Sequence, residues 1–268
     1  MIDLGFEGEM RVVDVETTGL YPTPTKKDPT EHNIISVCVM PITFNQDGPA
    51  DAGDPQTWVV NPGRSIPVQA TKVNGFRDKD VYDLPPFADV AQEIRDAIGK
   101  HPLVGHNVAF DKRFLQAEFQ RAGITGVNRN KPVCTMEATA KLMAAVGRHS
   151  DKWGWLNLDR TLSLLNSVAA KRMRRKSNTH GAQEDVELTG AVASILHQLS
   201  TMPKDKLKGV IRNMIDAWPE EQDKRELHRE RARRNRNNAD ADEQDEGFGC
   251  FAWVGVAVVV GVLLLALA

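Results

Sequence analysis

The stretch RVVDVETTGL, residues 11–20, has the apolar character of a buried β-strand as far as Val15, and its closing Thr-Thr-Gly ends the run. Asp14 and Glu16 interrupt that character. Because strand side chains alternate between two faces, two acids that lie two positions apart project from the same face. Like charges in a partly buried setting repel each other unless a cation lies between them. The pair therefore indicates either a divalent metal site or a strand whose acidic face is solvated.

The composition sets few limits on function. The 268 residues can form one large domain, or one domain with an appendage, and they can bury a substantial core. Lys and Arg number 34 against 36 Asp and Glu, so the net charge of -2 carries no global signature of nucleic-acid binding. The three cysteines match no metal or disulfide spacing, which favours a reducing compartment, and the N-terminal MIDLGFEGEM lacks a signal-peptide pattern.

Hydrophobic periodicity gives the order of the expected elements. Strand-like runs occupy residues 11–15, 34–40, 57–60 and 102–105. Helical periodicity occupies residues 87–98, 108–122, 136–146, 159–166 and 182–200. Strands first, followed by helices that alternate with a strand or two, indicate an α/β layer with a mixed sheet.

The character of the chain changes after Met202, so we predict a folded domain over residues 1–202. Residues 203–247 contain DKRELHRERARRNRNN and ADADEQDEG and are expected to form a charged linker or an exposed helix. Residues 248–268 end in an uncharged run whose length, at ~1.5 Å per residue, approaches the ~30 Å of a bilayer core. A single-pass C-terminal membrane anchor is the expectation, and a buried core helix is the alternative. The Arg-rich RERARRNR favours a cytoplasmic position for the folded domain.

Two further acids lie where acids are unfavourable. Asp111 falls in the first turns of a predicted helix, between Phe110 and Phe114 on its core-facing stripe. Asp185 heads the apolar face of the helix that continues through Leu188. Either carboxylate alone is explained by a favourable interaction with a helix dipole. Together with the first two acids, they can instead converge on two divalent cations, and ligation by oxygen alone suits Mg²⁺ or Mn²⁺ rather than zinc.

The segments DVETTGL, GHNVAFD and HGAQED resemble, in this order, the three motifs of the DnaQ-like DEDDh 3′–5′ exonuclease family. The resemblance covers about residues 9 to 200. It implies a ribonuclease H-like fold, with a mixed sheet of about five strands flanked by helices. It also implies metal ligands at Asp14, Glu16, Asp111 and Asp185, with His180 as the catalytic histidine. The connection of residues 21–33 is longer and more polar than is usual in the family.

The chemistry implied is hydrolysis of phosphodiester bonds at 3′ ends, with release of nucleoside monophosphates. Two metal ions would activate a water molecule and stabilise the leaving oxygen, with Asp14 as a bridging ligand. His180 would accept the proton of the water, because an imidazole with a pKa of ~6.5 titrates near neutral pH. His106 and Asn107 are expected to shape the turn before their helix and to cap it.

Substrate contacts follow from the resemblance and from local charge. The segment between the first two motifs suggests a Gly and an apolar residue near the terminal nucleotide, although a core Phe is the alternative. KRMRRK, residues 171–176, precedes His180 and favours contact with the phosphate backbone over a merely solvated loop. The candidate contacts are Thr17, Gly75, Phe76, Lys171, Arg172, Arg174 and Arg175.

Three functions remain open at this stage. The leading hypothesis is an exonuclease that acts on single-stranded or frayed 3′ ends of DNA. An exoribonuclease that trims RNA or oligonucleotides is the first alternative, since the metals contact phosphates and not the sugar. A non-catalytic, membrane-tethered nucleic-acid-binding protein is the second. Proofreading would require a polymerase or replication partner, which the sequence does not identify.

Overall fold

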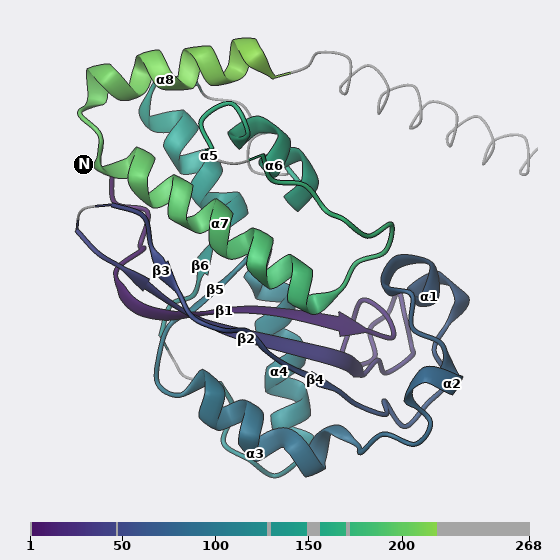
Figure 1. The fold of residues 1–268 in the computed structure, drawn as a ribbon. Coiled ribbons are helices and arrows are strands. Elements are labelled where there is room, and N and C mark those ends of the chain that lie inside the picture. Colours follow the sequence, from purple (N-terminus) through teal and green to yellow (C-terminus); the bar gives the residue numbers. More distant parts are fainter. Residues whose placement is uncertain (1, 47, 128–129, 149–155, 170–171, 219–268) are drawn as a thin grey trace, which may run out of the picture. The chain divides into compact units, whose positions relative to one another are not determined.

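The computed structural model describes residues 2–46, 48–127, 130–148, 156–169 and 172–218. A six-stranded mixed sheet runs through the centre of this part of the chain (Figure 1). Its strands are β1 (Gly8–Thr17), β2 (Ile34–Phe44), β3 (Asp51–Ala52), β4 (Gln56–Val59), β5 (Leu103–Gly105) and β6 (Val133–Cys134). The predicted α/β class with a mixed sheet is confirmed, with one strand more than the expected five.

The strand order is β3-β2-β1-β5-β6, and β4 also pairs with β2. The long β1 and β2 form an antiparallel pair, whereas β5 lies parallel to β1 and β6 lies parallel to β5. The two-residue strands β3 and β6 are too short to produce a periodic pattern, so the sequence analysis did not find them. Strand β1 therefore occupies the middle of the sheet and carries its acids into the interior.

Eight helices belong to the described residues. They are α1 (Val68–Asn74), α2 (Asp78–Val81), α3 (Phe87–Ile98), α4 (Val108–Arg121), α5 (Thr135–Ala145), α6 (Leu158–Leu165), α7 (Ala182–Thr201) and α8 (Lys204–Ala217). Five of them lie where periodicity predicted helices. Helices α1 and α2 were not predicted, because they are short and expose apolar side chains such as Val68 and Tyr82 instead of burying a stripe.

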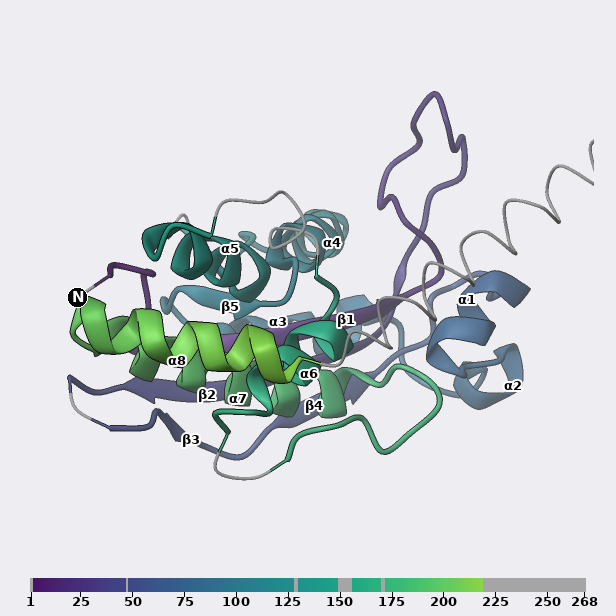
Figure 2. The same ribbon diagram turned by 90° about the horizontal axis from the view of Figure 1, so that it is seen from above.

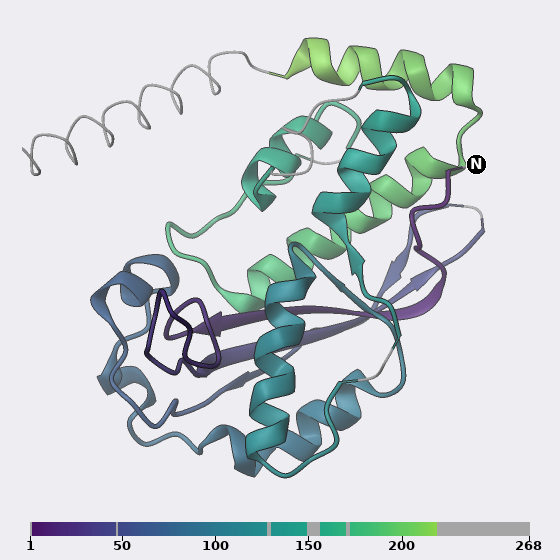
Figure 3. The ribbon, with the colours of Figure 1, turned by 180° about the vertical axis from the view of Figure 1, so that it is seen from behind.

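The alternation of side chains along β1 divides the core into two layers. Met10 and Val12 pack in one cluster together with residues of α7, while Val13 and Val15 pack in a second cluster with residues of α3 and α4. Figure 1 shows α7 along one face of the sheet, and Figure 3, from behind, shows α4 across the other. Even-numbered positions of β1 thus face α7, which directs its two acids toward that helix.

Helix α8 extends the compact unit as far as Trp218, beyond the predicted domain end at residue 202. Its residues Leu207, Ile211 and Met214 are buried in the same cluster as α7. Their spacing of four and three is that of one helix face, but the lysines between them made the segment resemble the start of a charged linker. The rest of the predicted linker and the whole predicted anchor, residues 248–268, lie outside the described residues.

No helix within the described residues is both long and apolar enough to cross a lipid bilayer.

The connection between β1 and β2 projects beyond the end of β1 (Figure 2). Its two ends are joined by a backbone hydrogen bond, 2.9 Å, from the N–H of Thr18 to the carbonyl oxygen of Asn33. A second, 3.2 Å, runs from the N–H of His32 to the carbonyl oxygen of Tyr21. These bonds hold the connection beside the end of β1, where the acids lie.

Candidate active site

Asp14 and Glu16 near the end of β1 meet Asp185 in the first turn of α7. One carboxylate oxygen from each of the three residues lies within 4.8 Å of the others. Glu16 and Asp185 are buried, with 7% and 5% of their surface exposed. The alternation of β1 and the packing of α7 over it produce this convergence, so the solvated acidic strand considered above is excluded.

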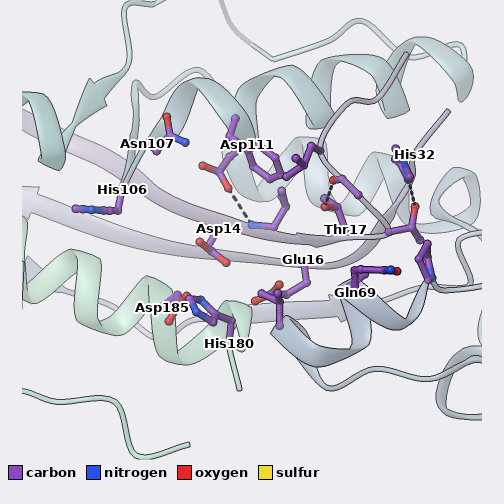
Figure 4. A pocket seen from close by; sticks show the side chains of 18 of the residues that line it. Asp14, Glu16, Thr17, His32, Gln69, His106, Asn107, Asp111, His180 and Asp185 are labelled. Carbon is purple, nitrogen blue, oxygen red and sulfur yellow. Dashed lines mark hydrogen bonds and ion pairs between the residues drawn. The ribbon is translucent and has the colours of Figure 1, made fainter. Parts of the chain in front are cut away.

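Asp111 lies in the first turn of α4 and is 3% exposed. Its Oδ1 accepts a hydrogen bond of 3.0 Å from the backbone N–H of Val15. Asp111 lines the same pocket as the three acids, and Figure 4 shows Asp14 between it and Asp185. It does not belong to the group whose oxygens lie within 4.8 Å of one another. Three of the four expected ligands therefore converge, and the fourth stands beside them.

Asp14, Glu16 and Asp111 have raised pKa values and hold protons more strongly than free carboxylic acids do. Burial, reinforced by the neighbouring Asp111 and Glu16, raises the pKa of Asp14 well above its usual range. Burial is also the main cause that raises the pKa of Glu16 to about 7, and it raises the pKa of Asp111 to about 7 against the opposing hydrogen bond from Val15. At neutral pH the cluster is thus an unfavourable concentration of negative charge, which a divalent cation would stabilise.

The donor set fits such a cation. Three convergent carboxylates without sulfur or a coordinating imidazole are the ligands preferred by hard cations of the Mg²⁺ and Mn²⁺ type. The same pocket places Asp111 within electrostatic reach of Asp14 and offers a further carboxylate. The cluster therefore supports the use of divalent metal.

The raised pKa values predict how stability depends on pH. A carboxyl group whose pKa is higher in the folded state than in the unfolded state stabilises the fold at low pH, and that contribution is lost as pH rises through the folded pKa. With Glu16 and Asp111 near 7, the melting temperature in EDTA is expected to fall by several degrees between pH 5.5 and pH 8. Differential scanning calorimetry measures this fall, and Mn²⁺ at pH 8 should reverse it. Glu16→Gln should make it smaller, and a melting temperature that rises over this interval would contradict the charge assignment.

His180 precedes α7, and its Nδ1 lies 3.2 Å from Oδ2 of Asp185. That hydrogen bond is the main cause that raises the pKa of the imidazole. The backbone N–H of His180 donates to the carbonyl oxygen of Val73 at 2.8 Å, so the end of α1 fixes the segment that carries the ring. The side chain is 47% exposed. With Nδ1 occupied by Asp185, Nε2 is the nitrogen left to accept a proton from a ligand.

The basic segment before His180 is divided between two environments. Arg172 and Arg174 are exposed, in accord with the expected position of backbone contacts, whereas Lys171 lies outside the described residues. Arg175 differs from the expectation, because its guanidinium turns inward and forms an ion pair with Asp185. Its Nε lies 3.4 Å from Oδ1 of Asp159, and its side chain is only 9% exposed. Arg175 thus offsets the charge of the acids instead of facing an incoming strand.

A pocket of about 530 Å³ extends from the acids in two directions. The expected contact Thr17 lines it, but Gly75 and Phe76 do not. Gly75 ends α1 in a left-handed conformation, with φ of 80°, and Phe76 packs against the buried cluster of Ile35, Ile66 and Val81. Gly75 and Phe76 thus lie outside this lining, and substrate contact by either residue stays a prediction. The pocket is instead lined there by Pro67, Gln69, Ala70 and Val73.

The turn before α4 forms the other end of the pocket. His106 is held at both ring nitrogens, 2.8 Å from Oγ1 of Thr135 and 2.8 Å from the carbonyl oxygen of Leu156, so it shapes the turn as expected. Asn107 does not cap the helix with its side chain and adopts the left-handed conformation, with φ of 69°. The expected capping role was wrong, because the backbone and not the side chain makes the turn.

The fold and the site define a class of protein. Buried carboxylates at the end of a central strand, opposed by a histidine one turn before a third acid, suit metal-assisted cleavage of a phosphodiester bond. The chain belongs to the exonuclease family that the description "Exonuclease" (RNase_T) denotes, since the profile of that family matches residues 12–193. Its curated relatives include a 3′-5′ exonuclease, in line with the resemblance to the DnaQ-like family.

The curated relatives include an exonuclease and subunits of DNA polymerase III. The 3′-5′ exonuclease DinG of Bacillus subtilis is 28% identical over 198 residues, which cover 74% of this chain and 18% of DinG. The DNA polymerase III subunit epsilon of Haemophilus influenzae is 26% identical over 216 residues, 78% of this chain and 77% of that protein. The epsilon-like protein of Rhodobacter capsulatus is 32% identical over 140 residues, 52% of this chain and 18% of that protein. The chain thus spans only about a fifth of some relatives.

Solved structures support the fold. A product-bound exonuclease I superposes with a TM-score of 0.53 at 15% identity and covers 76% of this chain and 46% of its own. A zinc-bound complex of Escherichia coli ExoI with single-stranded DNA has a TM-score of 0.50 at 17% identity, over 70% of this chain and 40% of its own. At such identities the comparison establishes a shared architecture and nothing about substrates.

Proposed function

We propose that the chain removes nucleotides one at a time from single-stranded or frayed 3′ ends of DNA and releases nucleoside monophosphates by a two-metal mechanism. The observation that carries the proposal is the convergence of Asp14, Glu16 and Asp185 within 4.8 Å, with Asp111 beside them. Divalent ions bound there would supply charge neutralisation at the phosphoryl group and a more acidic water molecule. DNA is favoured because the relatives include subunit epsilon of DNA polymerase III.

The residues of the chain divide the remaining work. Asp14, Glu16 and Asp185 would hold divalent metal, and Asp111, on the other side of Asp14, would offer a further carboxylate. Nε2 of His180 would take the proton of the attacking water, while Nδ1 keeps the ring oriented through Asp185. Arg172 and Arg174 would contact the phosphate backbone of the strand. The likeness to epsilon subunits also supports a polymerase or replication partner.

The alternative substrate is RNA, since the acids recognise phosphates and not the sugar. Digestion of 3′-end-labelled single-stranded DNA, duplex DNA and RNA in parallel, with Mg²⁺, Mn²⁺ or EDTA, decides between the two. Release of labelled mononucleotides from DNA in Mg²⁺ and none in EDTA is the expected result. Faster release from RNA would establish the alternative, and shortening from the 5′ end alone would overturn the proposal.

The localisation that we propose is a membrane, with residues 248–268 as a single spanning helix and the nuclease in the cytoplasm. The support is the composition of residues 251–268, which contain no charged side chain and are rich in Val, Leu and Ala. We predict that the full chain sediments with membranes and stays there after salt and alkaline washing, whereas a version that ends at Glu246 is released. Recovery of the full chain in the soluble fraction would refute the anchor.

A further inference from the structure

The pocket has a polar end that the catalytic chemistry does not use. Figure 4 shows His32 and Gln69 at this end, away from His106 and beyond Glu16. Asp28 lines the pocket here as well. Asp28 and His32 belong to the connection between β1 and β2, the segment that is longer and more polar than is usual in the family. The end is therefore a feature of this chain's own connection.

A chain of hydrogen bonds fixes the carboxylate of Asp28. The hydroxyl of Thr18 accepts from the backbone N–H of Asn33 at 3.0 Å, and its oxygen lies 3.3 Å from Nδ1 of His32. Nε2 of His32 lies 2.9 Å from Oδ2 of Asp28, and Oδ1 of Asp28 accepts from the N–H of Thr30 at 3.0 Å. In this network Nε2 of His32 carries a proton and donates it in a hydrogen bond to Asp28. Each carboxylate oxygen of Asp28 then has a hydrogen-bond partner, which fixes the orientation of the group.

The surroundings leave this network little freedom. Thr18 is buried, with 1% of its surface exposed, and the side chain of His32 is 8% exposed. The imidazole lies directly on the backbone of Gly19, where a Cβ would come within 2.3 Å of the ring. The side chain of Asp28 is 30% exposed. Buried partners thus hold a carboxylate that remains open to a ligand.

The chemistry of this end is that of a hydrogen-bond acceptor. The hydrogen bond from His32 is the main cause that lowers the pKa of Asp28, so its carboxylate stays ionised at neutral pH. His32 is occupied at both nitrogens and offers the pocket no donor. An ionised carboxylate accepts hydrogen bonds and cannot donate them, so it selects a ligand that carries a donor and disfavours an anionic one.

The size and the lining of the pocket suit one nucleoside. Leu20, Ala70 and Val73 line the same pocket as the acids and Asp28, and Leu20 and Val73 are 65% and 50% exposed. A volume of about 530 Å³ is typical of a small-molecule site with apolar walls and a few placed polar groups. If the phosphate of a nucleotide binds at the acids, its nucleoside would therefore lie along these apolar walls. The polar edge of the nucleoside would then lie near Asp28.

We infer that Asp28, positioned by His32 and Thr18, is a specificity residue that accepts a hydrogen bond from the 3′-terminal nucleoside. The inference deepens the proposed function and depends on it for the identity of the ligand. The donor is a 2′-hydroxyl or the exocyclic amine of a base, since both present an N–H or O–H to an acceptor. Hydrogen bonds to a charged group are strong enough to produce about tenfold discrimination or more.

Calorimetric titration in Mg²⁺ tests this with the wild-type chain, Asp28→Asn and the control Asp54→Asn, an exposed acid outside the pocket. Cytidine 5′-monophosphate against its deoxy form isolates the hydroxyl, and 2′-deoxyadenosine 5′-monophosphate against the 2′-deoxynucleotide of unsubstituted purine isolates the amine. The wild-type chain and the control should prefer the donor in at least one pair by about tenfold. Asp28→Asn should lose that preference, because it loses the charge and gains a competing donor.

Binding is measured without turnover, so the two proposals fail separately. Equal affinities within both pairs for the wild-type chain, or an unchanged preference in Asp28→Asn, overturn the specificity role of Asp28. The wild-type comparison holds even where the variant is poorly folded. A chain that discriminates between these nucleotides but shortens no oligonucleotide would instead overturn the exonuclease proposal and leave the binding role of Asp28 standing.

Discussion

Asp14→Asn is expected to reduce metal-dependent release of mononucleotides by about 10³-fold or more. The carboxylate lies at the centre of the acids, and the loss of one metal ligand removes several kcal/mol of transition-state charge stabilisation, of which ~4 kcal/mol corresponds to that factor. Single-turnover hydrolysis of a 3′-labelled oligonucleotide measures the loss, and titration with Mn²⁺ followed by calorimetry should show weaker binding.

The same substitution is expected to stabilise the fold. Because the pKa of Asp14 is raised by burial and by Asp111, the ionised form destabilises the native state at neutral pH without metal. The neutral amide has no such charge, so Asp14→Asn should melt at a higher temperature than the wild type in EDTA at pH 7.5. Full activity in this variant would refute the two-metal assignment, and a lower melting temperature would refute the charge argument. Asp54→Asn serves as the control for the loss of one acid.

The clustered acids were accessible to sequence reasoning because local periodicity determines where they point. The two-residue alternation of β1 places Asp14 and Glu16 on one face, and the same alternation directs that face toward α7. Asp185 heads the apolar stripe of α7, so it had to lie near the sheet. His180 was assigned differently, from the resemblance of HGAQED to the third motif of the exonuclease family. The acids depend on short-range geometry, and the fold adds only the packing of one helix on one strand.

The walls of the pocket were not accessible in the same way. Helix α1 is short and exposes Val68 and Val73, so no periodic stripe marked it as an element. Its contribution to the pocket arises because the backbone of His180 bonds to Val73 across a separation of more than a hundred residues. Arg175 is a comparable case: its charge suggested an exposed contact, but the ion pair with Asp185 depends on how the segment before α7 folds back.

Helix α8 is a third element that the sequence alone could not predict. The alternation of lysines with Leu207 and Ile211 is equally compatible with a solvated linker and with an amphipathic helix. Which one forms depends on whether the rest of the domain offers an apolar surface. The cluster that contains α7 offers one, so the helix packs and the compact unit continues to Trp218.

His180→Ala is expected to lower the turnover number by roughly 10²- to 10⁴-fold while Mn²⁺ binding persists. Nδ1 of His180 contacts Oδ2 of Asp185, but its ring is not part of the group of three carboxylates that fits a cation. Its removal therefore deletes a proton acceptor and leaves the acids in place. Calorimetric titration with Mn²⁺ and single-turnover hydrolysis separate these effects, and His101→Ala, whose ring lies 3.8 Å from Glu9, is the matched control.

The pH profile gives a second readout of the same substitution. A general base must be unprotonated, so the rate of the wild type should fall as pH drops through the pKa of His180, which Asp185 raises above its usual value. At saturating Mg²⁺, which favours the ionised carboxylates, His180→Ala should lack that acidic limb. Loss of Mn²⁺ binding in the variant would instead place His180 among the metal ligands, and an unchanged acidic limb would assign the titration to Glu16 or Asp111, whose pKa values lie at about 7. Either result would transfer the proton acceptor from the histidine to the acids.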